Sequence, residues 1–454
     1  MAENDSLKSR ILRVGAWTVG VYALESLIRL GSSLVLTRLL FPEAFGLMAI
    51  VSTVPAALAM VSEVGIRGSV IRKEDPLEPG FLYTAWTIQV VRGVLIWIVS
   101  CLVCLILAMP AVRALLPPAS TLADSQLPAL LAVTSATAAI SGFQSINLFV
   151  MDRALDAKPM AICGMVSRFV SLPLMIWAAF VYESVWALVV GALVSQIVLT
   201  IASHRLVPGV AMRFGWVRSL ALPLLHDGKW IMLSSANGLV TTLGDRFILS
   251  LLMSAQQLGW YSIALLLLES VRSLLLKLQG QLTLAVVSVL KTQESDVAAK
   301  NYYRFRLPID VASFGAAGFF WSAGPALVHG LYGVRYAAAG EFLSIIAVGL
   351  VTLPYNLIAD MFFVKRMPKH YAMLSVVGTI GFVFFVLAGH WLSGVPGMLW
   401  GLALFRVPQA IVANVLAYRN GWIRPLREIA FLPCIALGAG CGYVFAWLAA
   451  SLGF

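Results

Sequence analysis

The sequence is poor in charged residues, and this shortage excludes an ordinary soluble protein. Only 12% of its 454 residues are Asp, Glu, Lys or Arg, whereas 60% are hydrophobic. A typical soluble domain has about 25% charged residues. With a mean hydropathy of +0.90, the chain is expected to be an integral membrane protein.

Residue patterns that bind metals or nucleotides, or that form disulfides, are also scarce. The five histidines never pair at metal-ligand spacing, and no G-x-x-x-x-G-K-[ST] stretch is present. We therefore expect no metal, no cofactor and no ATPase on this chain. The C-x-x-C spacing near residue 101 has no charged or His neighbour, so we expect packing rather than redox chemistry. All the cysteines lie in apolar stretches: Cys101, Cys104, Cys163, Cys434 and Cys441.

Apolar stretches long enough to cross a bilayer recur along the whole chain. About 20 helical residues span the hydrocarbon core, and lipid offers no partners to exposed backbone groups, so each stretch should be a helix. The fold class is therefore an all-α polytopic membrane protein with about thirteen spans. The predicted spans are 12–36, 43–66, 81–109, 126–150, 160–181, 184–204, 229–253, 257–288, 307–329, 337–364, 370–391, 395–417 and 428–450.

The basic residues predict the orientation, because cytoplasmic loops collect Lys and Arg. With a cytoplasmic N-terminus, 22 of the 32 Lys and Arg residues lie in cytoplasmic segments. The net charge of +11 is then mainly a topology signal, and the expected neighbours are anionic lipid headgroups rather than nucleic acid. An odd number of spans leaves two alternatives for the end of the chain: a C-terminus outside, or a re-entrant last segment.

A weak internal repeat predicts two lobes. Residues 30–51 align with 243–264, matching Gly31 with Gly244 and Gly46 with Gly259. Two halves of six helices would be related by an axis along the membrane normal, around a central cavity. The expected divisions are an N-terminal lobe 1–204, a cytoplasmic linker 205–228, a C-terminal lobe 229–417 and a peripheral helix 418–454. The aromatic and basic residues of the linker predict an interfacial amphipathic helix.

Ionisable residues inside the spans are the candidate functional residues, because each is costly in a bilayer and normally faces protein or water. Glu25 with Arg29 and Glu269 with Arg272 have helical spacing, so both local pairing and a cavity-facing role are open for them. Polar stripes on the fourth, seventh and tenth spans are expected either to join helices or to line a wet pathway. The full set is Arg29, Arg92, Arg168, Arg246, Arg272, Lys277, Arg406, Glu25, Asp245, Glu269, Asp310, Glu341 and Asp360.

Some of these arginines lack a local partner and are the strongest candidates for substrate binding. Arg92, Arg168 and Arg406 have no acidic residue within a helical turn. The chain also prefers Arg, 23 against 9 Lys, and a guanidinium suits bidentate phosphate or carboxylate binding. The alternative for Arg92 is a structural ion pair with Glu63 or Asp310. The candidate cavity set is Arg92, Gln89, Arg168, Arg246, Arg272 and Arg406, and the ion-coupling candidates are Asp245, Asp310 and Asp360.

Three stretches carry a family resemblance. Residues 36–54, "LTRLLFPEAFGLMAIVSTV", with 62–97 and 244–267, resemble the polysaccharide transporter family of lipid-linked oligosaccharide flippases. This family belongs to the multidrug, oligosaccharidyl-lipid and polysaccharide (MOP) export superfamily. The resemblance implies twelve core helices in two lobes, often with two more. The matching residues are Arg38, Pro42, Gly46, Gly65, Trp86, Arg92, Asp245, Arg246, Gly259 and Tyr261.

The expected function is a flippase rather than an enzyme. It would carry an undecaprenyl pyrophosphate-linked oligosaccharide to the outer leaflet of the bacterial inner membrane by alternating access. The glycan would serve exopolysaccharide, capsule or O-antigen synthesis, with polysaccharide polymerase and export machinery as further partners. One alternative is a cation-coupled drug exporter of the same superfamily. Another is a polyprenyl-dependent glycosyltransferase or ligase, but the longest outside loop holds only Arg113 and Asp124 as charged groups.

The orientation is tested by labelling introduced cysteines with a membrane-impermeant reagent. A cysteine beside Arg213 should react only after the membrane is opened, because this basic loop is expected in the cytoplasm. A cysteine beside Gln256 should react in intact cells and is the matched control. Labelling at Arg213 in intact cells would reverse the predicted topology.

Overall fold

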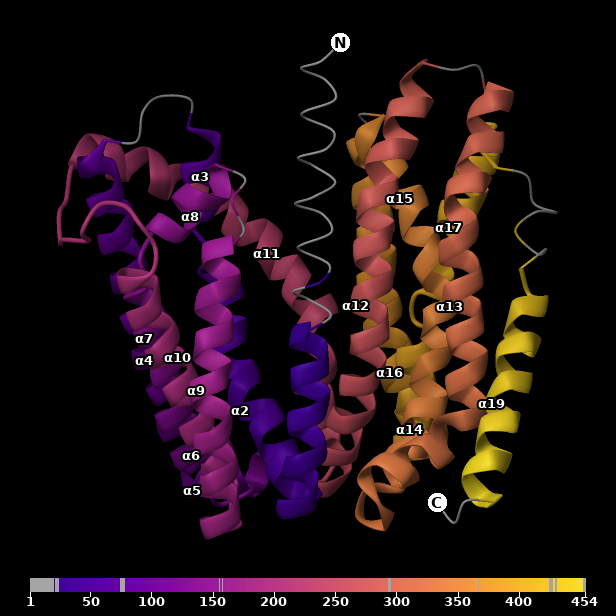
Figure 1. The fold of residues 1–454 in the computed structure, drawn as a ribbon, viewed down its shortest axis with the longest axis horizontal. Helices are drawn as coiled ribbons and strands as arrows, with labels where there is room; N and C mark the ends of the chain where they lie inside the picture. The colour runs from indigo at the N-terminus through magenta and orange to yellow at the C-terminus, as the bar shows by residue number, and fades with distance from the viewer. Residues whose placement is uncertain are drawn as a thin grey trace. The chain divides into compact units, whose positions relative to one another are not determined.

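The structure is a computed structural model that describes residues 20, 24–73, 78–154, 156, 158–292, 295–365, 367–423, 428 and 431–451. All regular secondary structure in these residues is helical (Figure 1). The chain forms two compact units, Met1–Gly259 and Trp260–Phe454. The predicted lobes 1–204 and 229–417 stay a prediction.

The first unit is built from long helices joined by short turns. Proline lies at the start of α2 and α4, where its fixed φ suits the first helical turn. Gly65 adopts a left-handed conformation with a φ of 71° and connects α2 to α3. The elements are α2 (Pro42–Val61), α3 (Ile66–Arg72), α4 (Pro79–Ala108), α5 (Pro110–Leu115), η1 (Thr121–Ala123), α6 (Leu127–Thr134), α7 (Ala136–Gly142), α8 (Asn147–Arg153), α9 (Lys158–Tyr182), α10 (Trp186–Arg205) and α11 (Arg218–Leu252).

Helix α12 (Ala255–Thr292) begins in the first unit and continues into the second. In the second unit, α13 packs closely along α14 and α19. Helix α16 contains a kink at Ser393 and Gly394, where the backbone is not helical. The elements of the second unit are α13 (Ser295–Tyr332), η2 (Val334–Tyr336), α14 (Ala338–Ala347), η3 (Val348–Tyr355), α15 (Asn356–Val364), α16 (Pro368–Leu404), α17 (Val407–Arg419) and α19 (Pro433–Ser451).

The prediction of a multi-pass membrane protein is confirmed. Eight helical segments in the described residues are long and apolar enough to cross a membrane, or nine if the bent pair Leu127–Gly142 and Asn147–Arg153 forms one span. One of the eight, Pro368–Arg419, has 52 residues and is long enough for the two spans predicted there. Residues 12–19 and 21–23 of the predicted span 12–36 lie outside the described residues. The number thirteen is therefore not confirmed.

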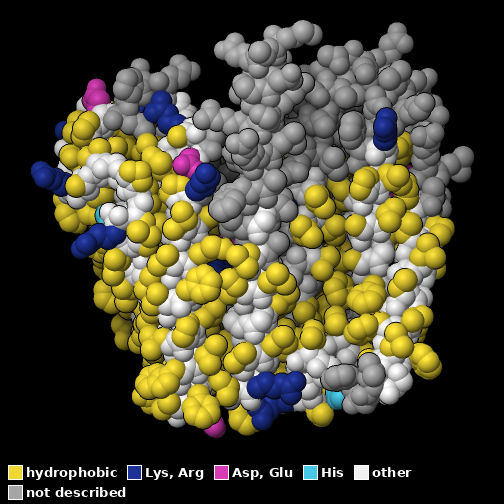
Figure 2. All heavy atoms as spheres, in the orientation of Figure 1, with side chains coloured by type: hydrophobic (Ala, Val, Ile, Leu, Met, Phe, Trp, Pro, Cys, Tyr) yellow, Lys and Arg dark blue, Asp and Glu magenta, His cyan; other side chains and the backbone are white. Residues whose placement is uncertain are grey.

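Apolar side chains form both the core and the exposed sides of the first unit. Leu40, Ile50, Leu130 and Ala179 are buried within one cluster that joins α2, α6 and α9. Many other large apolar side chains are exposed, including Phe180 at 69%. Figure 2 shows hydrophobic side chains covering the helices of this unit, on the left of the view. An apolar outer surface of this kind suits contact with lipid.

The linker differs from the predicted interfacial helix over 205–228. Residues 210–217 are not helical, and α11 begins only at Arg218. Pro208 and Gly209 interrupt the helical pattern, and side chains of α4 then hold the extended segment. The Thr87 hydroxyl accepts a hydrogen bond from the Gly215 N–H at 3.1 Å, and the Thr84 hydroxyl accepts one from the Val217 N–H at 3.1 Å.

Two glycines allow α2 to approach the first turn of α12 closely. A Cβ on Gly46 would collide with the Ala255 carbonyl, and a Cβ on Gly259 would collide with the Pro42 carbonyl. The contact is reciprocal, because the repeat that aligns Gly46 with Gly259 also aligns Pro42 with Ala255. The glycines thus explain one of the matches that define the weak repeat.

Replacing either glycine should destabilise the protein. Gly46→Leu and Gly259→Leu should each lower the free energy of unfolding by about 1–3 kcal/mol or more, because the obstructing atoms belong to the backbone. Gly31→Leu is the matched control, since a Cβ there meets nothing within 4 Å. Thermal unfolding in detergent should separate the variants. Equal melting temperatures for all three would contradict the close contact.

Candidate functional site

Arg92 on α4 lies against the end of α2. Its Nη2 forms an ion pair with Glu63 Oε2 at 2.9 Å and donates to the Ala59 carbonyl, and its Nε donates to the Ser62 hydroxyl at 3.2 Å. The last carbonyls of a helix need donors and favour positive charge. Glu63 also accepts a hydrogen bond from the Gly65 N–H at 3.0 Å. Arg92 therefore links α4 to the turn between α2 and α3.

Gln89 has other partners, although it precedes Arg92 by one helical turn. Its Nε2 donates to the Gly142 and Gln144 carbonyls, both at 3.0 Å, next to the end of α7. The Trp86 indole also donates to the Gln144 carbonyl, at 3.1 Å. The structure does not bring the side chains of Gln89 and Arg92 to a common partner, and a shared role in substrate binding stays a prediction.

The remaining candidates of the first unit lie on α9 and α11. Arg168 on α9 has Glu25 as its ion-pair partner at 4.0 Å, so its charge is balanced across helices rather than within one. Asp245 and Arg246 are partly buried neighbours on α11. Within the described part of the chain, Arg246 forms no ion pair. A role of Arg246 in substrate binding stays a prediction.

In the second unit, Arg272 and Arg406 share one carboxylate. Of the two roles open for Glu269 and Arg272 on α12, the structure shows the local ion pair. Arg406 precedes α17, is partly buried, and lies within electrostatic range of both Arg272 and Glu269. Its guanidinium lies 5.2 Å from the Phe405 ring centroid, and among the described residues no carboxylate lies within 4.0 Å of it. Among the described residues, these two guanidinium groups and one carboxylate leave an excess of one positive charge.

A second charged cluster surrounds Arg306, a residue that the sequence analysis placed in a cytoplasmic segment. Its Nε pairs with Asp310 Oδ1 at 2.9 Å, and its Nη1 pairs with Glu428 Oε2 at 2.8 Å. The guanidinium also lies 4.6 Å from the Tyr355 ring centroid on η3. Asp310 was an ion-coupling candidate, and its spacing of four from Arg306 was a visible signal for this pair. Asp360, the other candidate of this unit, lies half-buried on α15.

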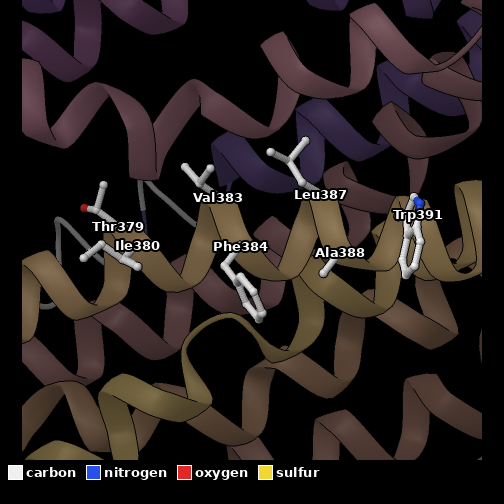
Figure 3. A pocket seen from close by; sticks show the side chains of 7 residues that line it. All are labelled: Thr379, Ile380, Val383, Phe384, Leu387, Ala388 and Trp391. Atoms are coloured by element: carbon white, nitrogen blue, oxygen red, sulfur yellow. The ribbon is translucent and has the colours of Figure 1, made fainter.

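The second unit also has an apolar groove along α16. Its volume is about 720 Å³, and the described residues that line it all lie on this helix (Figure 3). None of these described lining residues is charged, so the groove suits hydrocarbon chains rather than phosphate or sugar. The lining residues are Thr379, Ile380, Val383, Phe384, Leu387, Ala388 and Trp391.

The described residues contain no group of three or more His, Cys, Asp or Glu side chains that could hold a metal ion. The chemistry that they offer is instead binding. Guanidinium groups at intermediate burial can replace the hydration of an anion, and the apolar sides of the helices face lipid. The fold and these residues together define a membrane protein with a transporter architecture.

Comparison with known proteins assigns the family. Residues 35–341 match the family of polysaccharide biosynthesis proteins, and the chain belongs to this family. No curated protein matches the sequence. Among solved structures, the lipid II flippase MurJ in an inward closed conformation is 10% identical, with a TM-score of 0.68 over 96% of this chain and 93% of that one.

A multidrug resistance MATE family transporter of the MOP superfamily, in an inward-facing conformation, is also similar. It is 14% identical, and the match covers 89% of this chain and 95% of that one, with a TM-score of 0.64. At such low identity these likenesses establish the fold, which is the one expected from the family resemblance. The structural neighbours are transporters rather than enzymes.

A double-mutant cycle tests the link between Arg92 and Glu63. Arg92→Ala should lower the free energy of unfolding by about 1–2 kcal/mol, because it leaves Glu63 without its ion-pair partner. This value lies between those typical of exposed and of buried ion pairs. Adding Glu63→Gln should restore part of the folded protein, and Arg92→Lys should keep part of the stability. Membrane abundance and thermal unfolding are the measurements.

The same variants separate the two roles considered for Arg92. Normal abundance of Arg92→Ala with loss of glycan export would instead assign this arginine to substrate binding. An abundant variant with full export would contradict both roles.

Proposed function

We propose that the protein is a flippase for an undecaprenyl pyrophosphate-linked oligosaccharide. The substrate would enter from the cytoplasmic leaflet of the bacterial inner membrane and leave in the outer leaflet, by alternating access. Membership in the polysaccharide biosynthesis family and the fold of MOP-superfamily transporters support this proposal. MurJ, a lipid II flippase by its description, has the same fold.

The physical requirement for such a protein is a polar path for the headgroup. A pyrophosphate and several sugars cannot enter hydrocarbon without losing the hydration of every charge and hydroxyl group. The polyprenyl tail has no such cost and can stay in lipid. Exposed apolar helix faces such as the groove on α16 suit a tail of this kind.

The observation that carries the proposal is the excess positive charge at Arg272 and Arg406. Arg406 is partly buried and shares only Glu269 with Arg272. An arginine at such a position is costly unless an anion or water compensates it. A pyrophosphate would supply this compensation through charge-assisted hydrogen bonds. A drug exporter that takes cations should have the opposite excess at its binding site, so the transport of a cationic drug is the less favoured alternative.

The other candidates have proposed roles that follow from their partners. Arg246 would add to the anion site, because the described residues give it no ion pair. Arg168 would contribute less, since Glu25 already balances its charge. We further propose a cytoplasmic N-terminus and delivery of the glycan to a polysaccharide polymerase and export machinery.

Neutralising Arg406 should block translocation without unfolding the protein. Arg406→Gln should lower glycan export by about tenfold or more, because a hydrogen bond to a charged group contributes about 1.5–3 kcal/mol. Arg406→Lys should keep part of the activity, since it keeps the charge but loses the planar fork. Accumulation of the lipid-linked glycan in the cytoplasmic leaflet is the measurement.

Arg419→Gln is the matched control, because this arginine is exposed at the end of α17 and should leave export unchanged. Full export by an abundant Arg406→Gln protein would contradict the proposed anion site. Accumulation of an unrelated substrate in place of the lipid-linked glycan would contradict the proposed function itself.

A further inference from the structure

The cluster around Arg306 is the most deeply buried group of charges that the structure describes. The side chains of Arg306, Asp310 and Glu428 are 1%, 0% and 11% exposed. Tyr302 accepts a hydrogen bond from Arg306 Nη1 at 3.1 Å, and Tyr303 donates one to Glu428 Oε1 at 2.9 Å. The cluster joins α13 to the segment that precedes α19.

The ionisable groups of this cluster do not balance. Among the described residues, Asp310 faces the charged groups Arg306 and Glu428, and Tyr302, Tyr303 and Tyr355 are the tyrosines of this cluster. Tyrosine is neutral near pH 7. With both carboxyl groups ionised, two negative charges therefore face one guanidinium, and an unbalanced charge in a dry site is strongly unfavourable.

Four polar atoms of the cluster have no hydrogen-bond partner among the described residues: Arg306 Nη2, Asp310 Oδ2, Ser313 Oγ and Glu428 Oε2. Of these, Glu428 Oε2 still forms an ion pair with Arg306. Asp310 Oδ2 and Ser313 Oγ are buried without a hydrogen bond, and both residues are 0% exposed. Ser313 follows Asp310 by three residues and lies on the same face of α13. A proton on Asp310 Oδ2 would remove the charge imbalance and would convert an unpaired acceptor into a donor. One proton would thus account for both the charge imbalance and the unpaired oxygen atoms of Asp310 and Ser313.

A metal cation accounts less well for the charge imbalance and the unpaired oxygen atoms of this cluster. Sodium-sized and larger cations need several oxygen ligands, as calcium needs six to eight, whereas Arg306 occupies the space between the two carboxylates of this cluster. A guanidinium in that place repels a second cation. A proton needs only one oxygen and adds no volume.

We propose that Asp310 and Glu428 share one exchangeable proton, and that this proton is the one coupled to transport. The coupling half of this statement rests on the flippase function proposed above, whereas the proton site itself does not. Glu428 is the most exposed of the three charged side chains, so protons would exchange through its side. A proton can drive a conformational change only if one conformation binds it more tightly than the other.

Difference infrared spectroscopy of the purified full-length protein tests the proton site. Acidification should produce one protonated-carboxyl band in the wild-type protein. Both Asp310→Asn and Glu428→Gln should abolish it, because each variant leaves one carboxylate to balance Arg306. Both should also fold, since neither leaves an unbalanced charge. Glu341→Gln is the control, because this glutamate is exposed on α14.

Transport in proteoliposomes tests the coupling separately. A gradient of one pH unit, acid on the receiving side, should support about a tenfold accumulation of the lipid-linked glycan for each proton exchanged. Asp310→Asn should abolish this dependence, and a sodium gradient at equal pH should have no effect. A flippase that accumulates glycan with a sodium gradient alone would overturn the coupling proposal.

The two experiments fail in different ways. A wild-type band that persists in Glu428→Gln would overturn the shared proton, whatever the transport assay shows. A band that both variants abolish supports the proton site, even if no lipid-linked glycan is transported. The absence of glycan transport would overturn the proposed function and the coupling, but not the proton site.

Discussion

Each arginine inside the apolar helices must have its charge and its five N–H donors satisfied, and this requirement shapes much of the described structure. Three arginines meet it in different ways and to different extents, and Arg306 Nη2 stays buried without a hydrogen bond. Arg92 combines one carboxylate with the polar end of a helix. Arg306 combines two carboxylates, a phenol and an aromatic face. Arg406 has an aromatic neighbour and shares one carboxylate with Arg272. Of these three arrangements, the third has more guanidinium groups than carboxylates among the described residues.

Much of the fold could be predicted from the sequence, because a bilayer allows few alternatives. Long apolar runs must be helices in lipid, and α4, α9 and α10 closely follow the spans predicted at 81–109, 160–181 and 184–204. The reciprocal contact of Gly46 and Gly259 also agrees with the repeat alignment. The linker could not be predicted, because its extended form depends on hydroxyl groups of α4 that lie far away in the sequence.

The candidate site was only partly predictable. Helical spacing was enough for the pair Glu269 and Arg272, and Glu63 had been considered as a partner of Arg92. Arg306 was not among the predicted candidates, because the polar residues before it led to a predicted span that starts at residue 307, one position after it. Its second partner, Glu428, belongs to another part of the chain. Pairing between distant helices follows from packing, and no local pattern in one sequence reveals it.

The second unit contains charged clusters of opposite sign, and this has a thermodynamic consequence. Arg272 and Arg406 have an excess of positive charge, whereas Arg306, Asp310 and Glu428 have an excess of negative charge when both carboxyl groups are ionised. An anion at the first cluster and a proton at the second would each remove an imbalance. If the two clusters change their exposure in the same conformational transition, each ligand must alter the affinity for the other by the same factor. Within such a transition, a proton and an anionic headgroup that each bind one conformation more tightly than the other would have their movements coupled.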